Sequence, residues 1–233
     1  MPFSALHLPD SKRSILVFGS DGQVGREVKA YLENLNIPAI FLGRSQCDLS
    51  DAVELLAVLN RYRPQIIINA AAYTAVDKAE SEFEAAKLVN GTFPGELAKA
   101  TSALNARLFH YSTDYVFDGK ANKPYLPGHS RNPINSYGRT KAIGEELIES
   151  HATSFTIMRT AWLYGEYGRC FPKTIKSLLE TRPSVSIVHD QSGQPTWARD
   201  VALLTGNLID STPSYSHVHA TSAGFTTWFG FAQ

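Results

Sequence analysis

Short apolar runs alternate with longer amphipathic segments along the first two thirds of the chain. The runs are rich in β-branched residues and too short for helices, so we interpret them as buried strands. They span residues 15–18, 39–42, 66–68, 108–111 and 155–158. Strands that alternate with segments of helical length are typical of a parallel sheet with helices on both faces.

The amphipathic segments predict helices over residues 23–35, 51–62, 82–104 and 136–150. We expect the third helix to break around Gly91 to Pro94, because proline can begin a helix but does not fit inside one. Residues 119–133 are rich in Pro, Gly and Asn and predict a long loop beside the candidate site. After Arg159 the pattern loosens into a helix over 171–180, a strand over 185–188 and a helix over 198–208.

Composition favours a small-molecule partner. The 233 residues carry 22 Lys+Arg and 22 Asp+Glu without a basic run, so we expect no nucleic-acid or membrane partner. Cys47 and Cys170 are far apart in sequence, which argues against a disulfide scaffold or a structural zinc and fits a reducing cytoplasm. We find neither a signal-peptide pattern in residues 1–14 nor an apolar stretch that approaches the length of a membrane span.

A glycine loop follows the first strand and opens the first helix. Its pattern is Gly19-x-x-Gly22-x-x-Gly25, looser than the Gly-x-Gly-x-x-Gly of many dinucleotide sites. Backbone N–H groups and the positive end of the helix dipole there favour a pyrophosphate. We therefore predict an α/β fold, a Rossmann-type doubly wound parallel sheet, with residues 1–158 as the NADP(H)-binding domain and 159–233 as a smaller substrate lobe.

The second strand ends at Gly43-Arg44, where an NAD-binding fold would carry an acid for the ribose hydroxyl. A guanidinium at this position suits the 2′-phosphate of NADP, so Arg44 predicts NADPH as the preferred cofactor. The alternative is an ordinary solvated surface arginine. Asp48 lies slightly further on and is placed to reach the adenine.

Three polar residues predict a hydride-transfer site. Tyr137 and Lys141 are four apart and share one face of a predicted helix, and an ammonium beside a phenol lowers the phenol pKa from about 10 toward neutrality. Thr113 ends the fourth strand, where its hydroxyl can donate to a carbonyl oxygen that Tyr137 also contacts. A Tyr–Lys pair at this spacing also occurs by chance. The pair indicates a hydride-transfer site only because the glycine loop and Thr113 accompany it.

Several other residues allow either a functional or a structural interpretation. Small residues from Asn69 to Ala72 end the third strand and either admit a ligand close to the backbone or pack tightly. Trp162 stacks on a sugar or base, or fills the core. His217 and His219 share one face of a predicted strand; without a third ligand nearby, a core or surface role is favoured over metal binding.

The chain resembles the dTDP-4-dehydrorhamnose reductase family of extended short-chain dehydrogenases. The resemblance lies in residues 18–25, 69–80, 111–119, 133–145, 159–164 and 190–196, and so covers nearly the whole chain from Ser14 onward. It implies reduction of the 4-keto group of a dTDP-linked deoxysugar by NADPH or NADH, within dTDP-rhamnose biosynthesis for bacterial surface polysaccharide such as lipopolysaccharide.

The resemblance also implies residue roles. Catalysis is assigned to Thr113, Tyr137 and Lys141, and the sugar nucleotide to Val76, Tyr115 and Trp162. The cofactor is assigned to Gly19, Gly22, Gln23, Val24, Asp48, Leu49, Ala71, Ala72, Tyr73 and Lys141.

Family members continue for several dozen residues beyond a helix that residues 226–233 resemble, so we expect a C-terminally short substrate lobe and weak turnover. In some relatives that tail joins an interface that holds magnesium. The residues present in this chain therefore do not support Mg²⁺ as a cofactor, although the resemblance makes it possible. Whether the protein forms a homodimer is left open by the sequence.

Two alternatives remain. Nucleotide-sugar dehydratases of the same superfamily carry an acidic pair after the Thr, whereas here Asp114 is followed by Tyr115, which favours simple reduction. A non-catalytic NADP(H)-binding protein, like the regulatory subunit of methionine adenosyltransferase, shares the fold, but the intact Thr113, Tyr137 and Lys141 argue against it.

Overall fold

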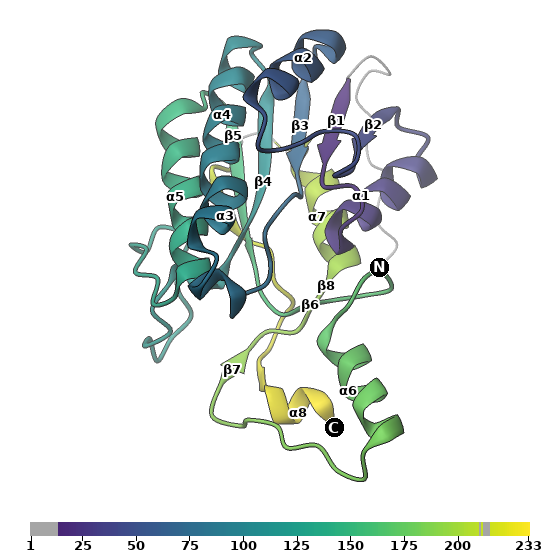
Figure 1. Ribbon diagram of the computed structural model, residues 1–233, viewed down its shortest axis with the longest axis vertical. Helices are drawn as coiled ribbons and strands as arrows, with labels where there is room; N and C mark the ends of the chain where they lie inside the picture. The colour runs from purple at the N-terminus through teal and green to yellow at the C-terminus, as the bar shows by residue number, and fades with distance from the viewer. Residues whose placement is uncertain (1–13, 210, 212–214) are drawn as a thin grey trace.

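A six-stranded parallel sheet forms the centre of the molecule (Figure 1). The computed structural model describes residues 14–209, 211 and 215–233, so residues 1–13 of the predicted first domain lie outside the description. In spatial order the strands are β2 (Ala39–Leu42), β1 (Ile15–Phe18), β3 (Ile66–Asn69), β4 (Arg107–Thr113), β5 (Phe155–Thr160) and β9 (His217–His219). The five strands predicted in the first 158 residues and the parallel sheet are confirmed, and β4 and β5 each run two residues further than expected.

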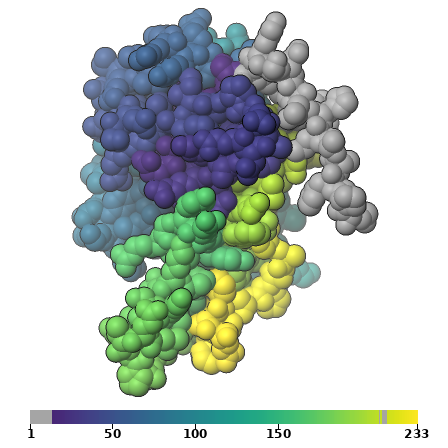
Figure 2. Space-filling view, turned by 90° about the vertical axis from the view of Figure 1, so that its right-hand side faces the viewer, coloured from purple at the N-terminus to yellow at the C-terminus, as the bar shows by residue number. Residues whose placement is uncertain are grey.

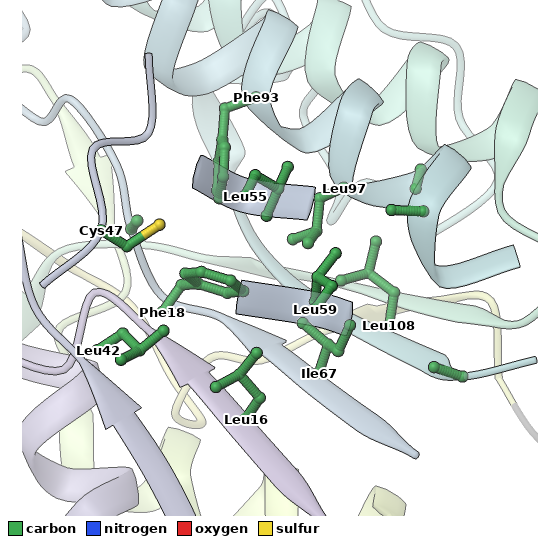
Figure 3. Packing of buried hydrophobic residues seen from close by; sticks show 14 of the residues in the cluster. Leu16, Phe18, Leu42, Cys47, Leu55, Leu59, Ile67, Phe93, Leu97 and Leu108 are labelled. Carbon is green, nitrogen blue, oxygen red and sulfur yellow. The ribbon is translucent and has the colours of Figure 1, made fainter. Parts of the chain in front are cut away.

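Each strand contributes to two hydrophobic cores because its side chains alternate between the faces of the sheet. On one face Leu16 and Phe18 pack under α2 (Ala52–Tyr62), α4 (Phe93–Ala103) and α5 (Ser136–His151). Figure 3 shows Phe18 at the centre of this cluster, beneath Leu55 and Phe93. On the other face Ile15 and Val17 pack against α1 (Gln23–Asn34) and α7 (Ala198–Ile209). Both faces are therefore covered, as the continuous apolar strands require.

The predicted break in the third helix is wrong. After the 3₁₀ turn η1 (Lys78–Glu80), α3 (Phe83–Lys87) passes through a π-helical turn, η2 (Leu88–Thr92), directly into α4. Pro94 lies in the first turn of α4. The wider π turn accommodates the proline without interrupting the helical path.

Residues after 158 divide between the sheet and a small separate region. Helix α7 packs on the second core, and β9 pairs with β5, so the central sheet crosses the predicted domain boundary. The region below the sheet in Figure 1 contains α6 (Phe171–Thr181), β7 (Ser192–Gly193), β10 (Thr226–Thr227) and α8 (Trp228–Ala232). The short pair β6 (Leu163–Tyr164) and β8 (Thr196–Trp197) connects it to the sheet.

The strand predicted over residues 185–188 is wrong. Val185 and Ile187 alternate with exposed residues, and Val188 O accepts a backbone hydrogen bond from Phe229 N in the final helix. No strand pairs along this segment in the described part of the chain, so the alternation gives a partly exposed loop. Among the described residues, no helix is both long enough and apolar enough to cross a bilayer.

Candidate active site

The candidate site lies at the carboxyl ends of β1, β3 and β4. Strand order reverses between β1 and β3, because the chain moves from β1 to β2 on one side and continues from β3 to β4 on the other. Ligands of open α/β sheets bind at such a switch point. The loops that carry Gly19 and Ala71 meet here: a Cβ placed on Gly19 would lie 2.4 Å from Ala71 N.

Each of the three glycines in the loop occupies its position for a different structural reason. Gly19 has a φ of +73°, which a side chain would strain, and Gly22 N donates to its carbonyl at 3.1 Å. A Cβ on Gly25 would lie 2.1 Å from Gly19 O, so the helix approaches the turn only without a side chain there. A Cβ on Gly22, the N-cap of α1, would meet only Gly19 O, at 3.4 Å. The helix start therefore has room for an anion and fits a pyrophosphate.

The residues after Gly22 divide between the loop and the core. Val24 is buried in the second core beside β1. Gln23 Nε2 donates to Arg169 O at 3.0 Å, which joins the glycine loop to the segment before α6. The sequence did not predict this contact.

The loop after β2 presents the predicted ribose contacts. Arg44 is exposed. The Asp48 carboxylate accepts from Ser50 N and Ser50 Oγ at 2.8 and 2.7 Å, and these hydrogen bonds lower its pKa. Leu49 is partly buried against the first core. This geometry leaves the Arg44 guanidinium accessible to a phosphate.

Two buried asparagines hold the end of β3. Asn69 Oδ1 accepts from Ala71 N at 3.1 Å. Asn90, in the π-helical turn, accepts from Tyr73 N and donates to Tyr73 O and to Thr140 Oγ1. The segment that contains Ala71, Ala72 and Tyr73 is thereby tied to α5. Asn90 was missed from the sequence, although a polar residue buried within a helix is a signal.

Thr113 and Tyr137 come together because α5 packs tightly on the turn after β4. A Cβ on Gly138 would lie 2.2 Å from Tyr115 O, so glycine permits this close approach. The Tyr115 and Tyr137 rings then meet edge to face at 5.6 Å between centroids. Thr113 Oγ1 accepts from Tyr115 N at 3.2 Å and donates to Asp114 Oδ1 at 3.1 Å, and it also hydrogen-bonds the Tyr137 side chain.

The expected lowering of the Tyr137 pKa by Lys141 is wrong for this structure. Burial raises the pKa of Tyr137 strongly, the hydrogen bond with Thr113 opposes the rise, and the nearby Asp114 adds to it. Burial also raises the pKa of Asp114, to about 6. Tyr137 is therefore protonated at neutral pH.

Lys141 lies beneath this site and is 1% exposed. Its Nζ donates to Tyr111 O at 2.7 Å and lies 3.1 Å from His110 Nε2. Burial lowers the pKa of Lys141 to about 8, and Glu145 partly offsets that effect. His110 was missed from the sequence, although a histidine inside an apolar strand is an informative signal.

Glu80 and Asn135 fix the beginning of α5. Ser136 N and Ser136 Oγ both donate to the Glu80 carboxylate at 2.7 Å, while Asn135 Oδ1 accepts from Gly138 N at 2.7 Å. These caps satisfy N–H groups at the helix start, one residue before Tyr137.

A cluster of acidic residues near His217 does not fit a metal. Glu145, Glu149 and His217 offer ligand atoms within 4.8 Å of one another. However, Arg159 makes two hydrogen bonds with Glu145, at 3.0 and 2.7 Å, and Arg131 bonds both carboxylates. Guanidinium groups thus occupy the carboxylates that a cation would need. His219 instead lies beside Phe117, with ring centroids 6.0 Å apart.

The predicted long loop lies against this arginine network. Arg159 Nη1 donates to Pro127 O at 2.8 Å, and Asn132 N donates to Val116 O at 2.8 Å. The loop is thereby attached to β5 and to η3 (Asp114–Val116), the short helix after Thr113.

Trp162 lies at the junction of the sheet and the small lower region. Its ring stacks on Trp228, with centroids 3.5 Å apart, and a Cβ on Gly193 would lie 2.3 Å from it. The backbone of Trp162 has a φ of +43°, which is uncommon for a bulky residue. The other predicted sugar-nucleotide residues, Val76 and Tyr115, are partly buried.

Comparisons with known proteins show which family this chain resembles. Residues 13–233 match the family model described as RmlD substrate binding domain. A dTDP-4-keto-6-deoxy-D-glucose reductase from Streptomyces niveus is 42% identical over 219 residues, which are 94% of this chain and 76% of that protein. A dTDP-4-dehydrorhamnose reductase from Escherichia coli is 39% identical with the same coverage.

The crystal structure of a dTDP-4-dehydrorhamnose reductase from Bacillus anthracis, in complex with NADP, superposes with a TM-score of 0.91. It is 34% identical and covers 95% of this chain, which in turn covers 78% of it. The match over almost the whole chain shows that it belongs to the dTDP-4-dehydrorhamnose reductase family.

Proposed function

We propose that this protein reduces the 4-keto group of a dTDP-4-keto-6-deoxyhexose with NADPH, in dTDP-rhamnose biosynthesis. The observations that carry the proposal are the hydrogen bond between Thr113 and Tyr137, the buried Lys141 one turn further along α5, and a glycine loop with room for a pyrophosphate. Reductases of the same family act on such sugars, as the names of the S. niveus and E. coli proteins state.

Tyr137 is the proposed general acid. Its raised pKa keeps the hydroxyl protonated at neutral pH, which is the state that can donate. When bound, NADPH supplies the hydride that reduces the carbonyl carbon. Tyr137 gives its proton to the carbonyl oxygen as negative charge develops there, a contribution of about 10²- to 10⁴-fold in rate.

Thr113 and Lys141 support this step. The Thr113 hydroxyl now points to Asp114 and would turn to donate to the same carbonyl oxygen. Lys141 is proposed to hold the nicotinamide ribose. The remaining cofactor contacts are proposed for Gly19, Gly22, Gln23, Val24, Arg44, Asp48, Leu49, Ala71, Ala72 and Tyr73.

The sugar nucleotide is proposed to contact Val76, Tyr115 and Trp162. Tyr115 packs on the Tyr137 ring, so it is adjacent to the proposed acid. The left-handed backbone of Trp162 is a strained conformation that the surrounding aromatic residues hold, and such strain concentrates at functional sites. A cytoplasmic location and a homodimer are part of the same proposal and need their own measurements.

Two rivals predict different chemistry. A dehydratase would need a second acid beside Asp114, where this chain has Tyr115. A non-catalytic binding protein would not need the buried Lys141 or the Thr113–Tyr137 contact.

The test is NADPH oxidation with dTDP-4-dehydrorhamnose, with a titration of NADPH alone in parallel. Substrate-dependent oxidation with a reduced sugar as product supports the proposal. Tight NADPH binding without turnover would favour the binding protein, and loss of water from the sugar would favour the dehydratase.

A further inference from the structure

We propose that Trp228 is a positioning residue for the sugar nucleotide, because its ring fixes the orientation of Trp162, the proposed contact with that substrate. The inference therefore rests on the proposed function. The two indole rings are nearly parallel, at an angle of 12°, and their centroids lie 3.5 Å apart. Trp228 thus covers one face of the Trp162 ring, while Trp162 as a whole stays partly exposed.

A two-stranded ribbon brings Trp228 to this position. Strand β10 pairs antiparallel with β7, with Thr226 opposite Gly193, and α8 begins with Trp228 directly after β10. The same ribbon also contacts Trp162 through Gly193, because a Cβ there would lie 2.3 Å from Cε2 of the indole. One ribbon therefore supplies two contacts to the Trp162 ring, one from β7 and one from the residue that follows β10.

The Trp162 backbone does not fix the ring by itself. Its φ of +43° is unfavourable for a bulky residue, so contacts from outside must stabilise it. One of them is a backbone hydrogen bond in which Thr196 N donates to Trp162 O at 3.2 Å. That bond holds the peptide group and leaves the side chain free to rotate. The orientation of the indole therefore depends on Trp228 and Gly193.

Aromatic side chains from two other elements hold α8 in place. The Phe171 ring at the start of α6 lies 4.6 Å from that of Trp228 and 5.4 Å from that of Phe231. Tyr164 of β6 meets Phe231 edge to face at 5.5 Å. Figure 2 shows the C-terminal segment, in yellow, beside the segment that contains α6, in green. No residue of α8, all of which the structure describes, is fully buried, so these ring contacts set its position.

Loss of the Trp228 ring should weaken sugar binding more than the chemical step. The proposed acid Tyr137 lies on α5, and Thr113 ends β4, so neither belongs to the ribbon or to α8. An indole offers a flat apolar face to a base or a sugar, and a displaced Trp162 loses this contact in the substrate complex and in the transition state alike. A loss of this kind raises KM and leaves kcat nearly unchanged.

The test compares Trp228→Leu with wild type by steady-state kinetics with dTDP-4-dehydrorhamnose, calorimetric titration of dTDP-rhamnose and titration of NADPH. We expect KM and the dissociation constant of dTDP-rhamnose to rise about 10-fold, with kcat and NADPH affinity within about twofold of wild type. Trp228→Phe keeps an aromatic face and should restore most of the affinity. Trp197→Leu is the matched control and should change neither constant, because this ring is 37% exposed and lies against Arg199.

A second variant and a spectroscopic signal separate positioning from folding. Gly193→Ala adds a methyl group where the Trp162 ring lies, so it should raise the same KM although Trp228 is intact. It also decides the question where Trp228→Leu does not fold. Two stacked indoles give an exciton couplet in far-ultraviolet circular dichroism, without any ligand. We expect this couplet in wild type and in Trp197→Leu, and its loss in Trp228→Leu.

An active wild type whose KM is unchanged in both Trp228→Leu and Gly193→Ala would overturn the inference. Equal increases in KM for Trp228→Leu and Trp197→Leu, or a wild-type protein without the couplet, would overturn it too. A wild type that shows the couplet but neither binds nor reduces the sugar would refute the proposed function, and this inference with it. The two failures are distinguishable, because wild-type turnover is intact when the inference alone fails.

Discussion

Single residues in this site have protonation states that their sequence neighbours do not reveal. The Tyr137–Lys141 spacing predicted a helix face correctly, and both residues lie on α5. The expected effect on pKa was wrong because Lys141 Nζ is directed to Tyr111 O and His110, while burial dominates at Tyr137. Spacing along a helix predicts which side chains lie on the same face. The protonation state of each side chain depends on its burial and on its contacts with other elements, which the spacing does not give.

Tyr137→Phe should reduce turnover by about 10²-fold or more, because the change removes the proposed proton donor and keeps the ring against Tyr115. NADPH affinity should hardly change. Steady-state kinetics with dTDP-4-dehydrorhamnose and a fluorescence titration of NADPH provide the two measurements. Tyr62→Phe, at the end of α2, is the control. Turnover of the Tyr137 variant within a few-fold of wild type would remove this residue from the mechanism.

Arg44→Ala should weaken NADPH binding by about 10- to 150-fold and leave NADH binding nearly unchanged, because a charge-assisted contact to the 2′-phosphate is lost. The two dissociation constants measure this directly. Arg61→Ala, an exposed arginine on α2, should affect neither cofactor. Equal losses for both cofactors in the Arg44 variant would show that Arg44 does not read the phosphate.

At the scale of elements, the sequence predicted the strands and most helices, because the spacing of apolar residues shows which side of each element is buried. It failed where a contact between elements decides the conformation. Instead of breaking near Pro94, the helix continues through a π-helical turn, and Ile143 of α5 packs against Gly91 in that turn. The expected strand over residues 185–188 has no partner strand among the described residues. Asn90 and His110 were missed because their partners lie on other elements.

Gly144→Ala should destabilise the protein although alanine favours helix. A Cβ on Gly144 would lie 2.1 Å from Asn90 O, so α5 must move away from the π-helical turn. Overpacking of this kind costs about 1–3 kcal/mol, which exceeds the helix-propensity gain of about 1 kcal/mol. Urea denaturation measures the change in free energy of unfolding. Gly128→Ala is the control and should hardly change the stability, because a Cβ at Gly128 would have no atom within 4 Å. Equal stability of the two variants would contradict the close packing of Gly144 against Asn90 O.

On the scale of the whole molecule, a partly buried ion-pair network joins parts of the chain that are far apart in sequence. Arg131 comes from the long loop, Glu145 and Glu149 from α5, Arg159 from β5 and His217 from β9. The sequence predicted the first five strands of this sheet and helix α5, but not that β9 would join the sheet across the expected domain boundary. Strand β9 has only three residues, and a hydrophobic pattern this short does not predict which strand it pairs with.

Glu145→Gln should destabilise the protein at neutral pH by about 3–5 kcal/mol, because two guanidinium groups lose their buried partner. Burial raises the pKa of Glu145, but Arg159 lowers it overall, and the Arg131 hydrogen bond lowers that of Glu149. A lowered folded-state pKa means that this stability is complete above the ordinary value of 4.5 and is lost as the pH falls below it.

The difference between wild type and Glu145→Gln should therefore shrink on acidification, which urea denaturation at several pH values measures. Glu146→Gln is the matched control, because its side chain is 60% exposed and its contact with Arg131 is long, at 3.8 Å. A pH-independent difference would show that the network does not act through the Glu145 charge.

The central claim is that this protein uses NADPH to transfer hydride to C4 of a dTDP-4-keto sugar while Tyr137 donates a proton to the carbonyl oxygen. The most direct measurement uses NADPH with deuterium at the transferred position and dTDP-4-dehydrorhamnose, followed by mass and NMR analysis of the product. The account predicts one deuterium at C4 of the reduced sugar with wild type and about 10²-fold less product with Tyr137→Phe. Unlabelled or unreduced sugar in the presence of bound NADPH would contradict it.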